Sequence, residues 1–211
     1  MKKNLVFLHV PKTAGTSMQT LLRLRGGKHI MDEDFDFEKM NHIVFIGSPD
    51  IDFMLRRTNI DKNWWKDSYK FAFVRNPWDR LVSCYHFFCR IRLSRDRVSN
   101  PCLKSWKTFI QRVVIDHEYL GVLKMSTSKS HFQAILPQVT WLRPYIDFIG
   151  KFENVNEDWA KLLENVGLEF EPLPHVNVSV HKPYREYYTK EIKDAVTKFY
   201  EEDIDTFKYT F

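Results

Sequence analysis

The chain has 211 residues, of which 44% are hydrophobic and 15% aromatic, and its formal net charge is +5. This length and composition predict one α/β domain with a real core that needs no disulfide staples. The positive charge fits a polyanionic ligand. The lysines and arginines are spread along the chain and form no recognised nucleic-acid motif, which argues against a nucleic-acid partner.

Short apolar runs alternate with helical patterns along the whole chain. This alternation predicts a mostly parallel sheet with helices on both faces. The expected strands lie near residues 4–10, 43–46, 70–75 and 145–152, and the expected helices near 16–25, 51–57, 77–92, 104–117, 156–166 and 189–207. No linker or internal repeat interrupts the pattern, so we expect a single domain over residues 1–211.

The first strand runs directly into a small-residue loop, LVFLHVPKTAGTS, at residues 5–17. Free N–H groups and the dipole at the start of the next helix favour an anion there. Gly15 lets the backbone approach an oxyanion closely. The loop also offers one cation and three hydroxyl donors, Lys12, Thr13, Thr16 and Ser17. The alternative is a tight turn with an incidental lysine.

This loop differs from the two common nucleotide-binding motifs. Its lysine precedes the glycine, whereas the P-loop GxxxxGK[ST] places the lysine after the second glycine. The GxGxxG fingerprint of dinucleotide folds is also missing. We therefore expect a phosphate-like group that is not held as in a standard nucleotide triphosphatase.

A second strand-to-helix junction lies at residues 69–88, YKFAFVRNPWDRLVSCYHFF. Arg75 ends the strand, and Asn76 and Pro77 suit the N-cap and the first helical position. Ser83 follows Asn76 by about two turns and shares its side of the helix. A guanidinium beside a hydroxyl suits a terminal phosphate monoester. The alternative for Arg75 is a structural salt bridge.

PKTAGTS and the later FVRNPWDRLVSCY together resemble the sulfotransferase superfamily. The resemblance is closest to bacterial and Golgi carbohydrate sulfotransferases, such as the heparan sulfate 2-O-sulfotransferase branch. It extends over most of the chain through YIDFIGKFENVNEDW, LPHVNVSVHKPYREYYTKEI and FYEEDIDTFKYTF. It implies a P-loop-like α/β fold, transfer of a sulfuryl group from PAPS (3′-phosphoadenosine 5′-phosphosulfate) with PAP as product, and no essential metal.

The resemblance also implies roles for individual residues. Lys12 would stabilise the bridging oxygen during transfer, and Arg75 and Ser83 would hold the 3′-phosphate. A basic and aromatic segment before the last helix would close over the nucleotide through Lys182, Tyr184 and Arg185. The 5′-phosphosulfate would lie against the first loop, at Lys12, Thr13, Ala14, Gly15, Thr16 and Ser17. For the later segment the alternative is a surface loop paired with Glu186 or Glu191.

The acceptor hydroxyl needs a base, and an imidazole suits neutral pH. His42 lies in the region where related carbohydrate sulfotransferases carry their catalytic histidine, although many carry it nearer the position of Ser48. His9, one step before the first loop, and Glu153 are the alternatives. Gln138, in LPQVTWL, also matches relatives, but the sequence indicates no physical role for it.

The resulting hypothesis is a PAPS-dependent sulfotransferase acting on a hydroxyl, with a carbohydrate as acceptor. An ATP-dependent small-molecule kinase and a non-catalytic nucleotide-binding module stay open as alternatives. A basic run from Arg90 to Arg97 is either an acceptor groove or a solvated face.

The cysteines and the N-terminus bear on the compartment. The three cysteines, Cys84, Cys89 and Cys102, lack a metal-ligand spacing and favour reducing conditions. The first apolar stretch is too short for a signal peptide, and no segment is long enough to span a membrane. We expect a cytoplasmic bacterial or viral protein, unless the chain is a trimmed Golgi-lumenal domain.

Overall fold

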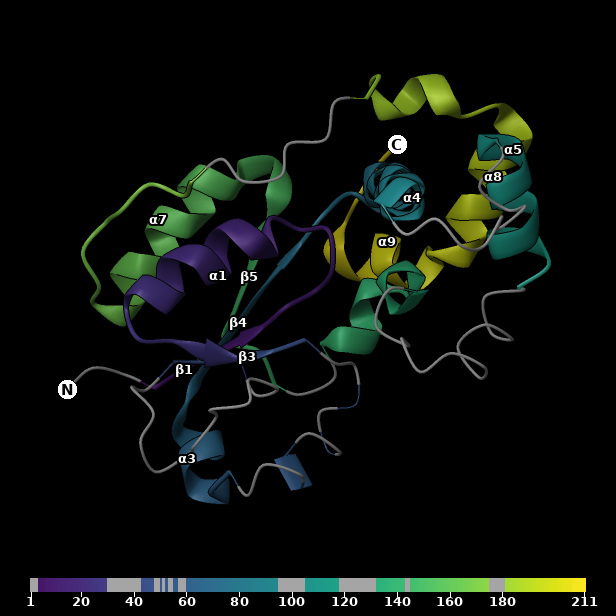
Figure 1. Ribbon diagram of the computed structural model, residues 1–211. Coiled ribbons are helices and arrows are strands. Elements are labelled where there is room, and N and C mark those ends of the chain that lie inside the picture. Colours follow the sequence, from purple (N-terminus) through teal and green to yellow (C-terminus); the bar gives the residue numbers. More distant parts are fainter. Residues whose placement is uncertain are drawn as a thin grey trace. The chain divides into compact units, whose positions relative to one another are not determined.

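The computed structural model describes residues 4–29, 43–47, 50, 52, 55–56, 60–94, 105–117, 132–142, 145–174 and 181–211. Its contacts divide the chain into two compact units (Figure 1). Unit 1 comprises Met1–Arg75 and Gln138–Val178, and unit 2 comprises Asn76–Pro137 and Ser179–Phe211. The single domain expected over residues 1–211 stays a prediction.

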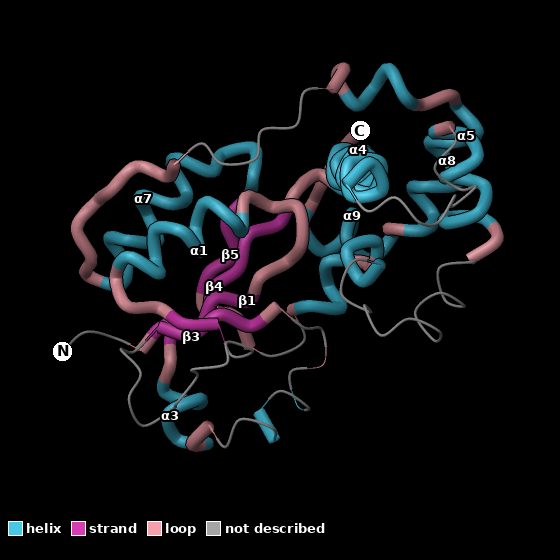
Figure 2. Tube along the Cα trace, viewed as in Figure 1, coloured by secondary structure: helices cyan, strands magenta, loops and turns pink. Residues whose placement is uncertain are grey.

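Unit 1 is built on a five-stranded sheet with the order β2-β3-β1-β4-β5. All the strand pairs are parallel, and β1 lies at the centre, between β3 and β4 (Figure 2). The carboxyl ends of β1 and β4 therefore meet at one edge of the sheet. The strands are β1 Leu5–Leu8, β2 Lys28–His29, β3 Ile43–Ile46, β4 Tyr69–Val74 and β5 Phe148–Lys151.

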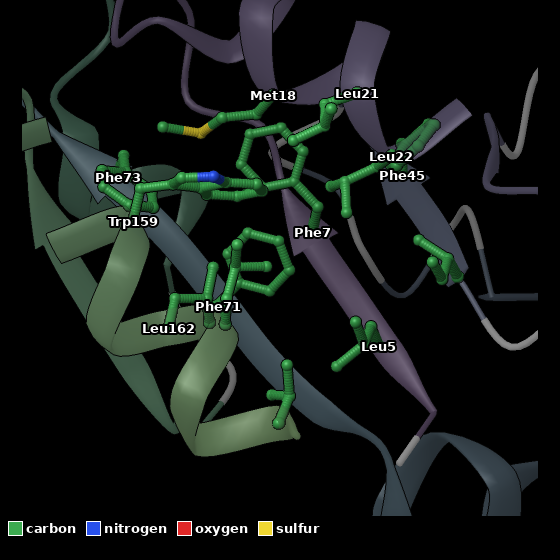
Figure 3. Packing of buried hydrophobic residues seen from close by; sticks show 13 residues of the cluster. Leu5, Phe7, Met18, Leu21, Leu22, Phe45, Phe71, Phe73, Trp159 and Leu162 are labelled. Atoms are coloured by element: carbon green, nitrogen blue, oxygen red, sulfur yellow. The ribbon is translucent and has the colours of Figure 1, made fainter. Parts of the chain in front are cut away.

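Helices cover both faces of this sheet. The helices α1 (Gly15–Leu24) and α7 (Val155–Val166) lie on one face, and α3 (Lys62–Asp67) lies on the other (Figure 1). Against α1 and α7 the core is aromatic: the rings of Phe7 and Phe71 stack 5.0 Å apart, and the fully buried Trp159 lies beside them (Figure 3). Every residue of β1 is buried, as expected for a strand covered on both faces.

Unit 2 is helical in its described parts. It contains α4 (Pro77–Ser94), α5 (Trp106–Ile110) with a π-helical turn at Gln111–Ile115, α8 (Lys190–Phe199), α9 (Glu201–Phe207), and 3-10 turns at Phe132–Ile135 and Tyr184–Tyr187. Arg80 is fully buried, and its guanidinium donates to the carbonyls of Ala134 at 2.8 Å and Leu136 at 2.7 Å. These two bonds offset part of the cost of burying the charge, while the Arg80 Nε has no hydrogen-bond partner among the described residues.

The α/β fold class with a mostly parallel sheet flanked by helices is confirmed, and most expected elements are present. Expectation and structure differ at the last helix, because Tyr200 leaves helical geometry (φ −111°, ψ 24°) and divides it into α8 and α9. The tyrosine is held there by its buried hydroxyl, which donates to the Ile135 carbonyl at 2.6 Å.

Three further differences concern short elements. The expected helix 104–117 becomes π-helical after Ile110. The strand β2 and the helix α3 were missed because two and six residues are too few to show a periodic pattern, although Trp64 and Trp65 of α3 pack against the core. The helix expected near 51–57 falls largely outside the described residues.

Among the helices of the described ranges, none combines the length and apolarity needed to cross a membrane. The compartment stays a prediction.

Gly167, at the end of α7, allows its left-handed backbone conformation to be tested by substitution. Gly167 is left-handed (φ +71°), its N–H bonds the Glu164 carbonyl, and no heavy atom lies within 4 Å of the position that a Cβ would take. We expect Gly167→Ala to lower the free energy of unfolding by about 1–2 kcal/mol, for backbone reasons alone. Gly167→Asn should cost less, since asparagine tolerates this conformation. Urea denaturation checks both, and equal stability of the alanine variant and the wild type would refute the assignment.

Candidate functional site

The loop after β1 has an unusual backbone. Lys12 (φ +71°) and Ala14 (φ +64°) are both left-handed although neither is glycine. Each such residue costs about 1–2 kcal/mol, and strain of this kind concentrates at functional sites. α1 begins at Gly15 without any side-chain cap. The loop therefore leads into a helix N-terminus without a capping side-chain hydrogen bond, and such N-termini favour anions.

The hydroxyl groups of this loop differ in their surroundings. Thr13 is fully buried, and its hydroxyl donates to the Val10 carbonyl at 2.8 Å. That hydroxyl stabilises the loop, so Thr13 would meet an anion through its backbone N–H. Ser17 is buried at the start of α1, and Thr16 is exposed. Ligand binding by Lys12–Ser17 stays a prediction.

Gly15 has a packing role that the sequence did not reveal. Its backbone is not left-handed, but a Cβ at this position would overlap the imidazole of His9. That ring is held in place, because it stacks on Phe7 with centroids 5.6 Å apart and its Nδ1 lies 3.3 Å from Nε2 of Gln19. The absence of a side chain at Gly15 thus allows His9 to lie against the start of α1.

Arg75, at the end of β4, contacts the first loop directly. One guanidinium nitrogen donates to the Lys12 carbonyl at 3.2 Å, and the guanidinium carbon lies 4.1 Å from the ring centroid of Phe152. Arg75 is only 8% exposed. The structure thus brings Arg75, predicted to hold the 3′-phosphate, into contact with Lys12, predicted to hold the 5′-phosphosulfate, within unit 1.

The backbone of Arg75 is held by Gln138. The Gln138 Oε1 accepts the Arg75 N–H at 2.9 Å, and its Nε2 donates to the Arg75 carbonyl at 2.8 Å. Gln138 is fully buried. The sequence marked this residue without a role, because its partner lies 63 positions away along the chain.

Ser83 and the cap of its helix belong to unit 2. Asn76 caps α4 as predicted, since its Oδ1 accepts the N–H groups of Trp78 at 3.1 Å and Asp79 at 3.3 Å. Ser83 is buried on α4. Its predicted role in holding the 3′-phosphate together with Arg75 stays a prediction.

The later basic segment, residues 181–185, also belongs to unit 2. Lys182 forms an exposed ion pair with Glu186 at 3.8 Å, as the surface-loop alternative expected. Such exposed pairs contribute little. The Arg185 guanidinium lies 4.8 Å from the ring centroid of Tyr184, which packs edge-on against Phe211. Contact of Lys182, Tyr184 and Arg185 with a nucleotide stays a prediction.

The three candidate bases are placed differently. His42 lies outside the described residues, as does Ser48, so its assignment is untested. His9 lies in the loop, against Gly15. Glu153 is exposed directly after Phe152, the residue that packs on Arg75.

Two other predicted features are described only in part. Arg90 is exposed on α4, whereas Arg95 and Arg97 of the basic run lie outside the described residues. Cys84 and Cys89 are reduced thiols, and Cys102 is also outside the described part. Among the described His, Cys, Asp and Glu side chains, no group of three is placed to hold a metal ion.

Sequence reasoning missed a histidine pair in unit 2. The rings of His86 and His181 stack 5.0 Å apart, and His86 Nε2 lies 2.8 Å from the Tyr187 hydroxyl. Burial, and secondarily His181, lower the pKa of His86.

This lowered pKa predicts a pH dependence of stability. The folded protein favours the neutral His86 ring more than the unfolded chain does, so the unfolded chain binds the proton first as the pH falls. Stability should therefore decrease as the pH falls below about 6.5, the ordinary histidine value, toward the folded pKa. His86→Gln should show a shallower decrease in denaturation midpoints between about pH 7.5 and 5.5. An unchanged or steeper slope would contradict this account.

The contact between Gly15 and His9 is testable by a double-mutant cycle. Gly15→Ala should destabilise the protein by about 1–3 kcal/mol, because the His9 ring must leave Phe7 and Gln19. Since His9→Ala removes the obstacle, the double variant should lose less stability than the sum of the two single variants. Chemical denaturation of the four proteins measures this coupling, and strictly additive losses would show that the ring does not constrain Gly15.

The chain is similar to several known proteins. A family model described as the sulfotransferase family matches residues 1–210 of this chain. An uncharacterized protein of Archaeoglobus fulgidus is 27% identical over 129 residues, which cover 61% of this chain and 92% of that protein. The crystal structure of a sulfotransferase from Alicyclobacillus acidocaldarius has the same fold, with a TM-score of 0.53, 13% identity, and coverage of 97% of this chain and 94% of that one. The whole-length match to the family model shows that this chain belongs to the sulfotransferase family.

Proposed function

We propose that this protein is a PAPS-dependent sulfotransferase that transfers a sulfuryl group to a hydroxyl of a carbohydrate. The observation that carries the proposal is the strained loop at Lys12 and Ala14, which leads into an uncapped helix and is bonded to Arg75. Membership of the sulfotransferase family supports the reaction class.

The donor's two ends suit different parts of the chain. The 5′-phosphosulfate suits the N-terminus of α1, where backbone N–H groups and the helix dipole favour an anion and Lys12 adds a charge. Arg75 suits the 3′-phosphate, since its permanently charged, forked guanidinium matches the geometry of a phosphate and lies beside Lys12. We assign Ser83 to the same phosphate from the resemblance alone.

The proposed reaction is an in-line transfer. The acceptor oxygen forms a bond to sulfur while the bond from sulfur to the bridging phosphate oxygen breaks, and PAP leaves. The hydroxyl proton passes to the base. Negative charge grows on the bridging oxygen, so a fixed Lys12 ammonium there would lower the barrier. His42 is our first choice as the base, with His9 and Glu153 as the alternatives.

The donor assignment is tested at Lys12. Lys12→Ala should lower kcat for sulfuryl transfer by about 10²–10³-fold, as the loss of a single stabilising donor does in other enzymes. The matched control is Lys161→Ala, which removes an exposed lysine of unit 1 that pairs with Asp158. Initial rates with radiolabelled PAPS measure the effect. Equal rates for the wild type and Lys12→Ala would contradict the role of Lys12.

The choice of donor separates the three functions. Calorimetry should show binding of PAP by the wild type without Mg²⁺, and weaker binding of ATP whether or not Mg²⁺ is present. Preference for ATP with Mg²⁺ would favour the kinase. Binding of PAP without turnover over a panel of glycans, phenols and tyrosyl peptides would favour the non-catalytic module, and turnover only on a phenol or peptide would refute the carbohydrate acceptor.

The base is tested by kinetics rather than binding. Replacing the true base, through His42→Gln, His9→Gln or Glu153→Gln, should lower kcat by about 10²–10⁴-fold while PAP affinity stays unchanged. It should also remove the acidic limb of the pH–rate profile. If His42→Gln retains full kcat and the acidic limb, His42 is not the base.

A further inference from the structure

We infer that Gln138 is a positioning residue of the donor site, which acts through Arg75 to hold Lys12 in its left-handed, anion-binding conformation. The catalytic importance of Gln138 rests on the proposed function, in which the loop binds the 5′-phosphosulfate of the donor. The inference follows from a chain of contacts within unit 1, from Gln138 to the Arg75 backbone, and from the Arg75 side chain to the Lys12 carbonyl.

The first link fixes the peptide of Arg75. Gln138 accepts from the Arg75 N–H and donates to the Arg75 carbonyl, at 2.9 and 2.8 Å, and both residues are buried. A carboxamide carries a donor and an acceptor on one planar group, which this two-point contact needs. Loss of the amide would leave both backbone groups without these bonds in a buried place, which is costly. The amide thus sets where the chain leaves β4.

The second link fixes Lys12. The direction of the Arg75 side chain follows from its backbone, and Phe152 supports the guanidinium from one side at 4.1 Å. The guanidinium then donates to the Lys12 carbonyl at 3.2 Å. A left-handed lysine persists only where its surroundings impose that conformation. A charge-assisted bond to its own carbonyl is such a constraint.

The two links predict how the phosphate-binding residues depend on one another. If Arg75 contacted only a 3′-phosphate, a change at Gln138 would weaken only ligands that carry that phosphate. If Arg75 also holds the loop, the same change must weaken a ligand with a 5′-phosphate alone. PAP and AMP differ in this group, and together they separate the two cases.

The test uses the full chain with Gln138→Met, which removes both bonds, Arg75→Lys, and the double variant. The control is Leu163→Ala, which removes a buried side chain of the same unit without touching Arg75. We expect Gln138→Met to weaken the binding of both PAP and AMP by about tenfold, the effect of losing the one bond from Arg75 to the Lys12 carbonyl. The double variant should bind no more weakly than Arg75→Lys, since Gln138 acts through Arg75.

Gln138→Glu adds a second measurement, the pH dependence of PAP affinity, which a purely structural role of Gln138 would leave unchanged. A protonated carboxyl can donate and accept as the amide does, whereas the carboxylate can only accept and faces the Arg75 carbonyl. PAP affinity of this variant, relative to the wild type at the same pH, should therefore recover as the pH falls from about 8 to 5. A pH-independent ratio would contradict the two-point contact.

Hydrogen exchange of the loop peptide, residues 9–18, separates failure of this inference from failure of the proposed function. In the ligand-free protein, exchange there should be faster in Gln138→Met and Arg75→Lys than in the wild type and Leu163→Ala. If the wild type binds no PAP, the proposed function fails, and faster exchange would still support the positioning role. If Gln138→Met keeps wild-type exchange and wild-type affinities, or weakens PAP alone, the inference is overturned.

Discussion

A charged guanidinium bonded to the carbonyl of a strained lysine is the interaction on which this site depends. It joins the carboxyl ends of β1 and β4, which are neighbours in a parallel sheet. Parallel sheets place their ligands at this edge, where the loops that follow the strands converge. The sheet therefore accounts for why Lys12 and Arg75 meet although they are 63 positions apart. The sheet does not determine the local conformation of the loop. That conformation depends on Arg75 and on the residues that hold Arg75 in place.

The left-handed residues of the loop carry a free-energy cost that fixed contacts must offset. Two left-handed residues together cost roughly 2–4 kcal/mol, while a carboxylate or phosphate at a helix N-terminus gains about 0.3–1 kcal/mol at an exposed position and up to about 2 kcal/mol when partly buried. In the ligand-free protein the strain must be offset by fixed contacts. The Thr13 hydroxyl on the Val10 carbonyl and the Arg75 guanidinium on the Lys12 carbonyl are contacts of that kind. A loop fixed by such contacts would pay no ordering cost on binding the anion proposed for it.

Local signals in the sequence were enough for much of the fold. The apolar run and the following small residues predicted β1, the loop and α1, and Asn76 and Gly167 correctly predicted the start of α4 and the end of α7. Positions whose reasons lie in the tertiary structure were not predictable. A left-handed Ala14 has no sequence signature, and Gly15 is needed because of a ring that faces it from the preceding strand end.

The same limit applies to Gln138 and to the His86–His181 pair, whose partners are remote in sequence. The resemblance to sulfotransferases identified the family, and the family model agrees over residues 1–210. It assigned Arg75 only to a phosphate, however. The contact with the Lys12 carbonyl indicates that Arg75 also stabilises the loop of the protein itself.

A crystal structure of the protein with PAP is the most direct test of the central claim that this loop is the 5′-phosphate site of a sulfotransferase. We expect the 5′-phosphate within hydrogen-bond distance of the backbone N–H groups at the start of α1 and of the Lys12 Nζ. Lys12 and Ala14 should remain left-handed, and the Arg75 bond to the Lys12 carbonyl should remain in place. A phosphate bound away from this loop, or a loop that gives up both left-handed residues on binding, would contradict it.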